Sequence, residues 1–241
     1  MSVLPAFSLL NVAKRYARGD SVVPIFDDLS MTIDEGDFLA LMGPSGSGKT
    51  TLLNLLGGID RANAGTMCYR GERFDNLSEA ALSHWRARHI AFVFQSFNLL
   101  PMLSAARNVE LPLTLTRLGG SERRRRVATA LELVGLAACA NRSPAQLSGG
   151  QQQRVAIARA LVADTDVLLC DEPTGNLDRA ASTEILELLQ LLNRDLGKTI
   201  IMVTHDQLAA EHAGIVLQLD KGQFVTTTVR QPNREVRLVH A

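Results

Sequence analysis

Residues 43–50 read GPSGSGKT, a glycine-rich loop that ends in a lysine and a threonine. The apolar run FLALM before it predicts a buried strand, and TTLLNLLGG after it predicts a helix that ends at a glycine pair. Glycines let the backbone turn tightly and bring its N–H groups close to an anion, and the helix N-terminus adds partial positive charge. The pattern predicts a phosphate-binding loop; a flexible glycine turn is the alternative.

Within this loop, Lys49 is expected to reach the β- and γ-phosphates of a nucleotide, and Thr50 to offer its hydroxyl to Mg²⁺. The residues assigned to nucleotide binding here are Gly43, Pro44, Ser45, Gly46, Ser47, Gly48, Lys49, Thr50 and Thr51.

An acidic pair follows another predicted strand. VLLC at residues 167–170 is a buried strand, and Asp171 and Glu172 come directly after it. In folds of this type, the carboxyl end of such a strand lies beside the phosphate loop. We expect Asp171 to help hold Mg²⁺ and Glu172 to polarise an attacking water. Because Pro173 follows, a solvated turn is the alternative interpretation.

A second glycine pair opens a helix in QLSGGQQQR, residues 146–154. Ser148, Gly149 and Gly150 there can present a hydroxyl and backbone N–H groups to an anion. Two phosphate-binding helix N-termini in one chain are unusual, and LSGGQ is the most specific pattern in the sequence.

The elements that must position these residues alternate between strand and helix, which predicts an α/β fold with a largely parallel sheet. The first 35 residues resemble short strands, and residues 95–147 indicate an inserted helical lobe. Strands are also predicted at residues 90–94 and 199–203, and helices at 76–89, 121–135, 149–164 and 178–197.

Several side chains have predicted structural roles. Asn76, with Glu79 three residues later, is expected to cap one helix, and Asp178 and Gly197 are expected to bound another. Trp85 is expected to pack between the helical lobe and the core. A helix-spaced stripe predicts further core, at Ile185, Leu188, Leu189 and Leu192.

The composition limits the possible classes of protein. The chain has 241 residues, is 46% hydrophobic, and carries 25 basic and 25 acidic residues. A nucleic-acid binder usually has a basic excess, so no nucleic-acid partner is expected. Three cysteines without metal-like spacing fit a reducing cytosol. We see no signal peptide and no membrane-spanning run, so any membrane role must come through a partner.

Taken together, these motifs resemble those of the ATP-binding-cassette (ABC) ATPases over residues 7–226. GPSGSGKT, FVFQ ending at Gln95, LSGGQ, VLLCDEP, GNLD ending at Asp178 and VTHD with His205 occur in the family's order. The resemblance implies a P-loop NTPase core at about 1–95 and 160–226, with an N-terminal antiparallel β subdomain. It also implies a helical subdomain at about 96–159 and leaves residues 227–241 as an unassigned tail.

The resemblance further implies that two copies enclose two ATP molecules head to tail. Each ATP would lie on Lys49 and Thr50 of one copy and be closed by Ser148, Gly149 and Gly150 of the other. Gln95 would touch Mg²⁺ and the attacking water, Glu172 would be the catalytic base, and His205 would contact the γ-phosphate. Asp178 would link the two active sites, and Tyr16 would stack on adenine.

Within the family, PTGNLD and FQSFNLLP look most like ATPase subunits of the macrolide-exporter and lipoprotein-releasing branch. That branch implies a partner permease in the membrane, docking near residues 97–102, and a place on the cytoplasmic face of the inner (plasma) membrane. The substrate would be a lipoprotein, lipid or drug. Ala106-Arg107 and the segment AAEHAGIVLQLDKG depart from the branch pattern.

Two alternatives stay open: a soluble ABC protein of translation or DNA repair, and a regulatory scaffold of the cell-division type that binds ATP with little turnover. The single cassette and the zero net charge argue against the first. The remaining histidines, His84, His89, His212 and His240, are expected to be ordinary surface or core residues. The run Arg123–Arg126 is expected to be a solvated helix face, with a binding patch as the alternative.

Overall fold

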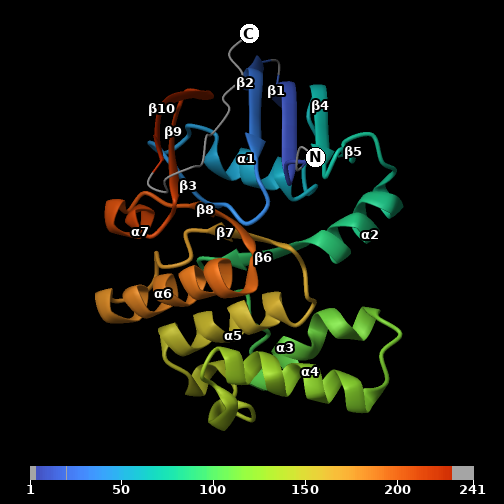
Figure 1. The fold of residues 1–241 in the computed structure, drawn as a ribbon, viewed down its shortest axis with the longest axis vertical. Helices are drawn as coiled ribbons and strands as arrows, with labels where there is room; N and C mark the ends of the chain where they lie inside the picture. Colours follow the sequence, from blue (N-terminus) through green and yellow to red (C-terminus); the bar gives the residue numbers. More distant parts are fainter. Residues whose placement is uncertain (1–3, 20, 230–241) are drawn as a thin grey trace.

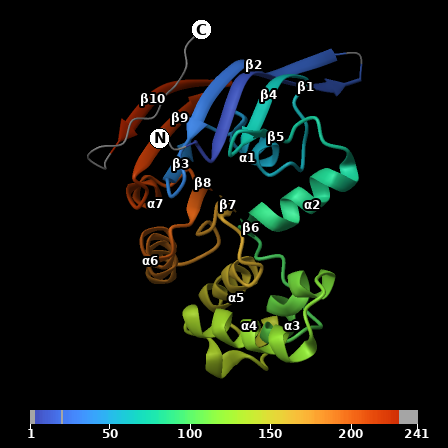
Figure 2. The same cartoon turned by 45° about the vertical axis from the view of Figure 1, so that its right-hand side comes forward.

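Two β-sheets and a lobe of helices make up the fold of residues 4–19 and 21–229, which are the residues that this computed structural model describes (Figure 1). One sheet is antiparallel and lies at the top of Figure 1, the other is mainly parallel and central, and α3, α4 and α5 lie below it. Figure 2, turned by 45°, shows the same separation of the helical lobe from the antiparallel sheet.

The antiparallel sheet has the strand order β2-β1-β4-β5. Its strands are β1 Phe7–Arg18, β2 Ser21–Ile33, β4 Ala64–Tyr69 and β5 Glu72–Arg73. The expected short strands at the N-terminus are instead two long ones of 12 and 13 residues, because irregularities in the β1–β2 register let the pairing continue. Leu29, Met31 and Ile33 are buried, as their alternation predicts.

The central sheet has the order β10-β9-β3-β8-β7-β6. Its strands are β3 Phe38–Met42, β6 Ile90–Phe94, β7 Val167–Asp171, β8 Thr199–Val203, β9 Ile215–Asp220 and β10 Gln223–Val229. All neighbours are parallel except β9 and β10, which confirms the predicted sheet. The carboxyl ends of β3, β7 and β8 therefore meet at one edge. β10 continues past residue 226, where the tail was expected to begin; residues 230–241, with His240, lie outside the described residues.

The helices lie between these strands and in the lobe. They are α1 Lys49–Leu56, α2 Glu79–His89, α3 Ala105–Glu110, α4 Gly120–Leu133, α5 Gly149–Leu161, α6 Arg179–Leu196 and α7 Gln207–Glu211. Short 3₁₀ turns occupy Leu111–Leu115, Ala137–Cys139 and Pro144–Gln146. No helix in the described ranges is long and apolar enough to span a bilayer.

The central sheet separates two hydrophobic cores, because successive side chains of a strand point to opposite faces. On one face, Ala40 and Met42 of β3 pack with the helical lobe and α6. On the other, Leu39 and Leu41 pack with α1 and the antiparallel sheet. β3 is thus buried on both faces, and the loop that follows it is held between the two cores.

Two of the local predictions are wrong. Ser78, and not Asn76, caps α2: its hydroxyl accepts a hydrogen bond from the Ala81 N–H, and its extended backbone suits that position. Trp85 does not contact the helical lobe. It stacks on Phe74 at 4.3 Å, within the core beneath the antiparallel sheet, because α2 packs on that side.

The predicted boundaries of α6 are confirmed. The Asp178 carboxylate accepts a hydrogen bond from the Ala181 N–H at 2.8 Å, and Gly197 ends the helix at a positive φ of 65°. The predicted stripe of this helix is buried in the core, at Ile185, Leu188, Leu189 and Leu192.

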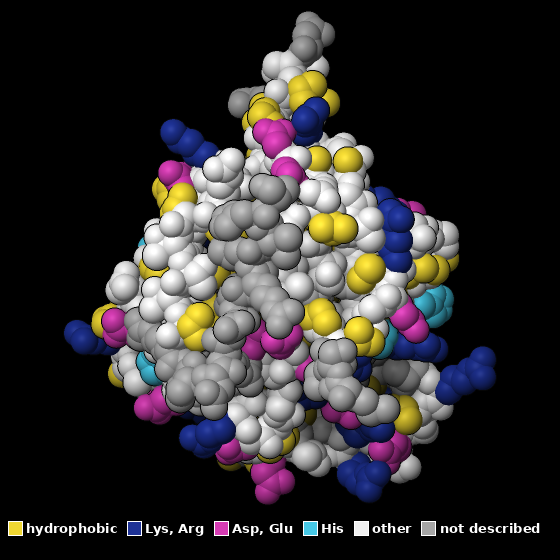
Figure 3. Space-filling view, turned by 45° about the horizontal axis from the view of Figure 1, so that its top comes forward, with side chains coloured by type: hydrophobic (Ala, Val, Ile, Leu, Met, Phe, Trp, Pro, Cys, Tyr) yellow, Lys and Arg dark blue, Asp and Glu magenta, His cyan; other side chains and the backbone are white. Residues whose placement is uncertain are grey.

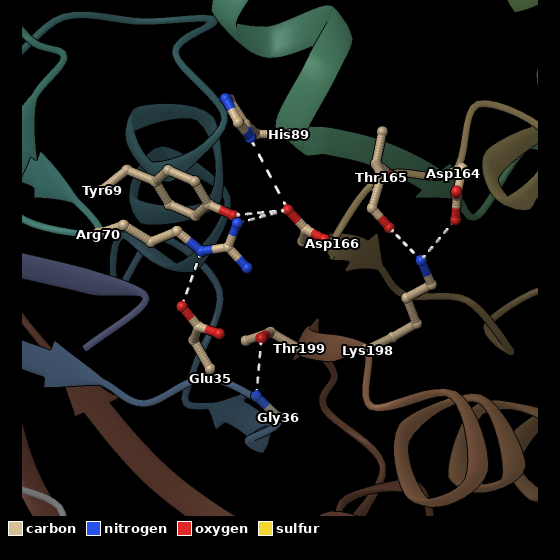
Figure 4. A network of polar contacts seen from close by, with 10 residues as sticks. All are labelled: Glu35, Gly36, Tyr69, Arg70, His89, Asp164, Thr165, Asp166, Lys198 and Thr199. Atoms are coloured by element: carbon tan, nitrogen blue, oxygen red, sulfur yellow. Dashed lines mark hydrogen bonds and ion pairs between the residues drawn. The ribbon is translucent and has the colours of Figure 1, made fainter. Parts of the chain in front are cut away.

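A polar network ties the antiparallel sheet to the amino end of β7 (Figure 4). Asp166 accepts hydrogen bonds from Tyr69 at 3.3 Å and Arg70 at 2.9 Å, and Arg70 also donates to Glu35 at 2.7 Å. Burial, followed by the charge of Asp166, raises the pKa of Tyr69. These contacts lie at the opposite end of β7 from its acidic pair, so they fix the sheets without entering the site.

On the face shown in Figure 3, hydrophobic side chains form separate spots among charges of both signs.

The predicted solvated face of α4 is confirmed: Arg125 and Arg126 pair with Glu122 at 2.7 and 3.0 Å, and Arg123 pairs with Glu110 at 3.3 Å. These arginines are held by carboxylates of the same lobe.

Candidate nucleotide-binding and catalytic site

The phosphate loop joins β3 to α1. Gly43, Gly46 and Gly48 all have positive φ angles, of 148°, 79° and 105°. A Cβ atom on Gly43 would lie 2.0 Å from the carbonyl oxygen of Leu219, so no larger residue fits there. The backbone can therefore turn closely around the start of α1.

Lys49 folds back over this loop. Its Nζ donates hydrogen bonds to the carbonyl oxygens of Gly43 at 2.7 Å and Pro44 at 2.9 Å. Ser47, in contrast, is buried, and its hydroxyl has no hydrogen-bond partner among the described residues. The ammonium group thus lies over the loop, whereas the Ser47 side chain faces the protein interior.

The acidic pair lies at the end of β7, beside the phosphate loop. Asp171 and Thr50 line the same pocket, so two of the side chains assigned to the metal are neighbours. Burial, and then the charge of Glu172, raises the pKa of Asp171, while Thr50 and Lys49 lower it. Two carboxylates next to a lysine and a hydroxyl form a suitable environment for a hard cation.

His205 follows β8 and contacts the second carboxylate. Its Nδ1 lies 2.8 Å from Oε1 of Glu172, and this hydrogen bond is the main reason that its pKa is raised. Glu172 itself has a positive φ of 49°, and its N–H donates to the Val203 carbonyl at 3.0 Å. This backbone geometry turns the chain after β7 toward the end of β8.

A pocket of about 400 Å³ brings these elements together. Its lining combines the phosphate loop, the acidic pair and the histidine, as predicted for a nucleotide site, and adds Ile25 of β2. The lining residues are Ile25, Gly43, Ser45, Gly46, Gly48, Lys49, Thr50, Thr51, Asp171, Glu172, Val203 and His205. A larger cavity of about 830 Å³ between α6 and α7 also reaches Glu172 and His205.

Tyr16 lies next to this pocket without lining it. The Tyr16 hydroxyl donates a hydrogen bond to Asp60. Burial, and then Asp60, raises the pKa of Tyr16, while the nearby Thr51 side chain, which lines the pocket, lowers it. With an exposed fraction of 39%, the ring is accessible to a ligand.

Gln95 is absent from the pocket lining. Its Nε2 donates to Oδ1 of Asn176 at 3.1 Å, and Nδ2 of Asn176 donates to the Gln95 carbonyl at 3.1 Å. A Cβ atom on Gly175 would lie 2.7 Å from Gln95 Nε2. Gln95 therefore packs on the loop after the acidic pair.

The second glycine pair also lies outside the pocket. Ser148 caps α5 through a reciprocal pair of hydrogen bonds with Gln151, at 3.1 and 3.3 Å. Cβ atoms on Gly149 and Gly150 would lie 3.3 Å from Leu177 and 3.0 Å from Ala181, so α5 packs closely on the start of α6. The predicted second anion-binding terminus and the phosphate loop therefore do not share this pocket within one chain.

Sequence reasoning missed Ile25, Asn176, Lys14 and Asp60. Ile25 is an ordinary apolar residue of β2, and Asn176 stands inside the predicted GNLD loop, where its amide has no distinguishing pattern. Lys14 and Asp60 meet only because β1 passes over the turn after α1. None of the four has a signal within its local sequence.

Comparisons with known proteins show the family of the chain. The family described as ABC transporter matches residues 26–175. The chain is 44% identical over 224 residues to the macrolide export ATP-binding/permease protein MacB of Sodalis glossinidius, covering 93% of the chain and 34% of that protein. It thus spans about one third of the length of this relative and of the similar MacB proteins.

Two further relatives match the chain over nearly their whole length. YvrO of Bacillus subtilis, named an uncharacterized ABC transporter ATP-binding protein, is 47% identical over 220 residues, covering 90% of this chain and 95% of YvrO. The ATP-binding cassette MJ0796, solved as a dimer in a post-hydrolysis state with ADP and Pi, has a TM-score of 0.85 and 40% identity, covering 94% of this chain and 99% of that one. The chain belongs to the ABC transporter family and is one of its ATPase cassettes.

Proposed function

We propose that this chain is the ATP-binding and ATP-hydrolysing subunit of a transporter, and that it works with a permease in the membrane. One observation carries the proposal. The pocket joins Lys49, Thr50, Asp171, Glu172 and His205, whereas the second anion-binding terminus of the same chain lies elsewhere. A complete nucleotide site then needs two chains.

The proposed assembly is a head-to-tail homodimer around two ATP molecules. The dimeric state of MJ0796 with ADP and Pi supports it, because that cassette shares 40% identity with this chain. In such a dimer, Ser148, Gly149 and Gly150 of one copy would close the nucleotide held by the other. Asp178, next to this terminus at the start of α6, would lie at the interface.

The residues of the pocket fit a magnesium nucleotide. Thr50 and Asp171 provide a hydroxyl and a carboxylate in the same pocket, and hard oxygen donors are what Mg²⁺ prefers. Bound there, Mg²⁺ would neutralise charge on the phosphate oxygens.

In the proposed reaction, Lys49 leaves its loop carbonyls and contacts the β- and γ-phosphates. The Glu172 carboxylate accepts a proton from the water that attacks the γ-phosphate. His205, already bonded to Glu172, orients that carboxylate and contacts the γ-phosphate. Gln95 would give up its contact with Asn176 to reach the metal and the water, and Tyr16 would stack on the base.

The membrane partner is proposed from two observations. The MacB relatives are named ATP-binding/permease proteins, so a cassette and a permease work together there. In this chain, Leu100 and Met102 are exposed, within the segment 97–102 that is the proposed docking site. The chain would then act on the cytoplasmic face of the membrane and drive export or extraction of a lipoprotein, lipid or drug.

The test is to tag the chain in its host, solubilise the membranes in mild detergent and identify what co-purifies by mass spectrometry. A membrane protein with a large extracytoplasmic domain is expected, together with ATP hydrolysis by the purified complex. A chain that stays in the soluble fraction, without any membrane protein bound to it, would contradict the transporter proposal.

A further inference from the structure

Two neighbouring side chains hold the ring of Tyr16. Its hydroxyl donates to Oδ2 of Asp60 at 2.5 Å. The Nζ atom of Lys14 lies 4.4 Å from the ring centroid. Lys14 stands two residues before Tyr16 on β1, and this contact places the two side chains next to each other.

Lys14 and Asp60 form an ion pair beside Tyr16. Lys14 is only 6% exposed, and its Nζ donates to Oδ1 of Asp60 at 2.6 Å and to the Arg61 carbonyl at 2.9 Å. A buried ammonium needs such a counter-charge. The two oxygens of Asp60 therefore hold different groups, one the lysine and the other the tyrosine hydroxyl.

The position of Asp60 links this pair to the phosphate loop. Asp60 lies in the turn that follows α1, the helix that begins with Lys49. Its N–H donates to the carbonyl of Asn54, which is in the last turn of that helix, at 3.2 Å. Asp60 thus connects the ring to the element that carries the phosphate-binding residues. The lysine lies over the ring, and the tyrosine is still 39% exposed, which leaves part of the ring accessible to a flat ligand.

We propose that Lys14 and Asp60 are positioning residues that hold the Tyr16 ring as a preformed stacking surface for the nucleobase. The inference rests on the proposed function, since it requires a nucleotide in the adjacent pocket. An aromatic ring can stack on any base, because stacking does not use the hydrogen-bonding groups at the edge of the base. A ring that is already ordered loses less entropy when the base binds. The Lys14 ammonium group is also attracted to the face of the ring, which helps to hold the ring in place.

A purely structural role for the pair makes a different prediction. If Lys14 and Asp60 only join β1 to the turn after α1, their loss weakens binding of every phosphate ligand equally or not at all. If they position Tyr16, their loss weakens only ligands that carry a base. Mg²⁺-ATP and Mg²⁺-tripolyphosphate differ in this respect and share the phosphate chain.

The experiment compares the dissociation constants of these two ligands by isothermal titration calorimetry, in the wild type and in Asp60→Asn. We expect the ATP constant to rise about 3- to 10-fold, as for the ordering of one side chain, while the tripolyphosphate constant is unchanged. In a Tyr16→Ala background, Asp60→Asn should cause no further loss of ATP affinity. Equal changes for both ligands, or an undiminished effect in the Tyr16→Ala background, overturn the proposal.

Two further variants guard the result. If Asp60→Asn fails to fold, Lys14→Met is measured in its place. This variant removes the buried charge itself and should show the same base-dependent loss of affinity. Asp27→Asn is the matched control, because Asp27 pairs with Arg15 at 3.1 Å in an exposed ion pair of β1 and β2, and it should change neither constant. If the wild type binds neither ligand, the proposed function fails, whereas failure of the positioning role alone leaves wild-type ATP binding intact.

Discussion

His205 and Glu172 are joined by a hydrogen bond of 2.8 Å between Nδ1 and Oε1, although 33 residues separate them in the sequence. The histidine side chain is 72% exposed and the glutamate side chain only 18%. The proposed catalytic base therefore already has a partner that solvent and a bound phosphate can both reach. The contact can be tested by titration.

The pKa of His205 is expected to lie above the ordinary histidine value of 6.5, because the Glu172 carboxylate favours the protonated ring. The ion pair is then complete at pH values below 6.5 and is lost as the pH rises through the raised pKa. NMR titration of the ring measures this directly. Glu172→Gln should move the pKa back toward 6.5.

Glu184→Gln is the control for this titration, since Glu184 of α6 pairs with Arg154 of α5 rather than with His205. The His205 pKa should be the same in this variant as in the wild type. A His205 pKa that is unaffected by Glu172→Gln would show that the two side chains do not interact in solution.

Lys49→Ala is expected to abolish ATP binding, because the loop N–H groups alone bind a polyphosphate weakly without a counter-charge. Calorimetry with Mg²⁺-ATP measures the loss. Lys198→Ala is the matched control: Lys198 donates to the Thr165 carbonyl at 2.7 Å near the amino end of β7, far from the pocket. Normal ATP binding by Lys49→Ala would refute the assignment of the phosphate loop.

Glu172→Gln is expected to bind ATP but to hydrolyse it about 10²- to 10⁴-fold more slowly, as for loss of a general base. Because hydrolysis then no longer opens the assembly, a dimer should accumulate with ATP and Mg²⁺. Light scattering after size-exclusion chromatography measures it.

If only monomer is found, the dimer proposal fails for the isolated chain. If the wild type hydrolyses ATP no faster than Glu172→Gln, the chain is a scaffold that binds ATP with little turnover. Size-exclusion chromatography thus tests the dimer, and the rate of ATP hydrolysis tests the catalytic role of Glu172.

Asn108 is expected to stabilise the proposed permease-docking segment. It is fully buried, and its side chain makes four hydrogen bonds, to Leu100 N and to the carbonyls of Leu100, Leu103 and Ser104. Asn108→Ala should lower the free energy of unfolding by about 1–3 kcal/mol, since buried polar groups lose their partner. Urea unfolding measures this, and ATP affinity should stay unchanged.

Asn193→Ala provides the comparison, because Asn193 is only half-buried and makes two such bonds, to the carbonyls of Gly36 and Lys198. It should cost less stability than Asn108→Ala. If Asn108→Ala unfolds at the same urea concentration as the wild type, the segment does not depend on this side chain.

The sequence was sufficient wherever a local pattern determines the structure. The apolar runs predicted β3, β6, β7 and β8, because a strand buried on both faces must be apolar throughout. Asp178 and Gly197 predicted the ends of α6 for a similarly local reason, since capping uses neighbouring N–H groups. The phosphate loop and the acidic pair met because parallel strands end at one edge of the sheet.

Contacts between distant segments could not be predicted in this way. Asn176 meets Gln95 across 81 residues, and Lys14 meets Asp60 across 46. Ser78 was overlooked because Asn76 is as good a cap by residue type, and only the backbone decides between them. Such choices depend on tertiary packing, which leaves no period or motif in the chain.

The two hydrogen bonds from Lys49 to the carbonyls of Gly43 and Pro44 affect how the loop binds a phosphate. The lysine ammonium group already interacts with two carbonyl oxygens of the loop. A phosphate that binds the lysine must therefore displace both of these hydrogen bonds. Binding is then an exchange, and its measured enthalpy will be smaller than the sum of the new contacts. Such an exchange favours a polyphosphate over a small monovalent anion, because only a multiply charged ligand replaces both contacts at once.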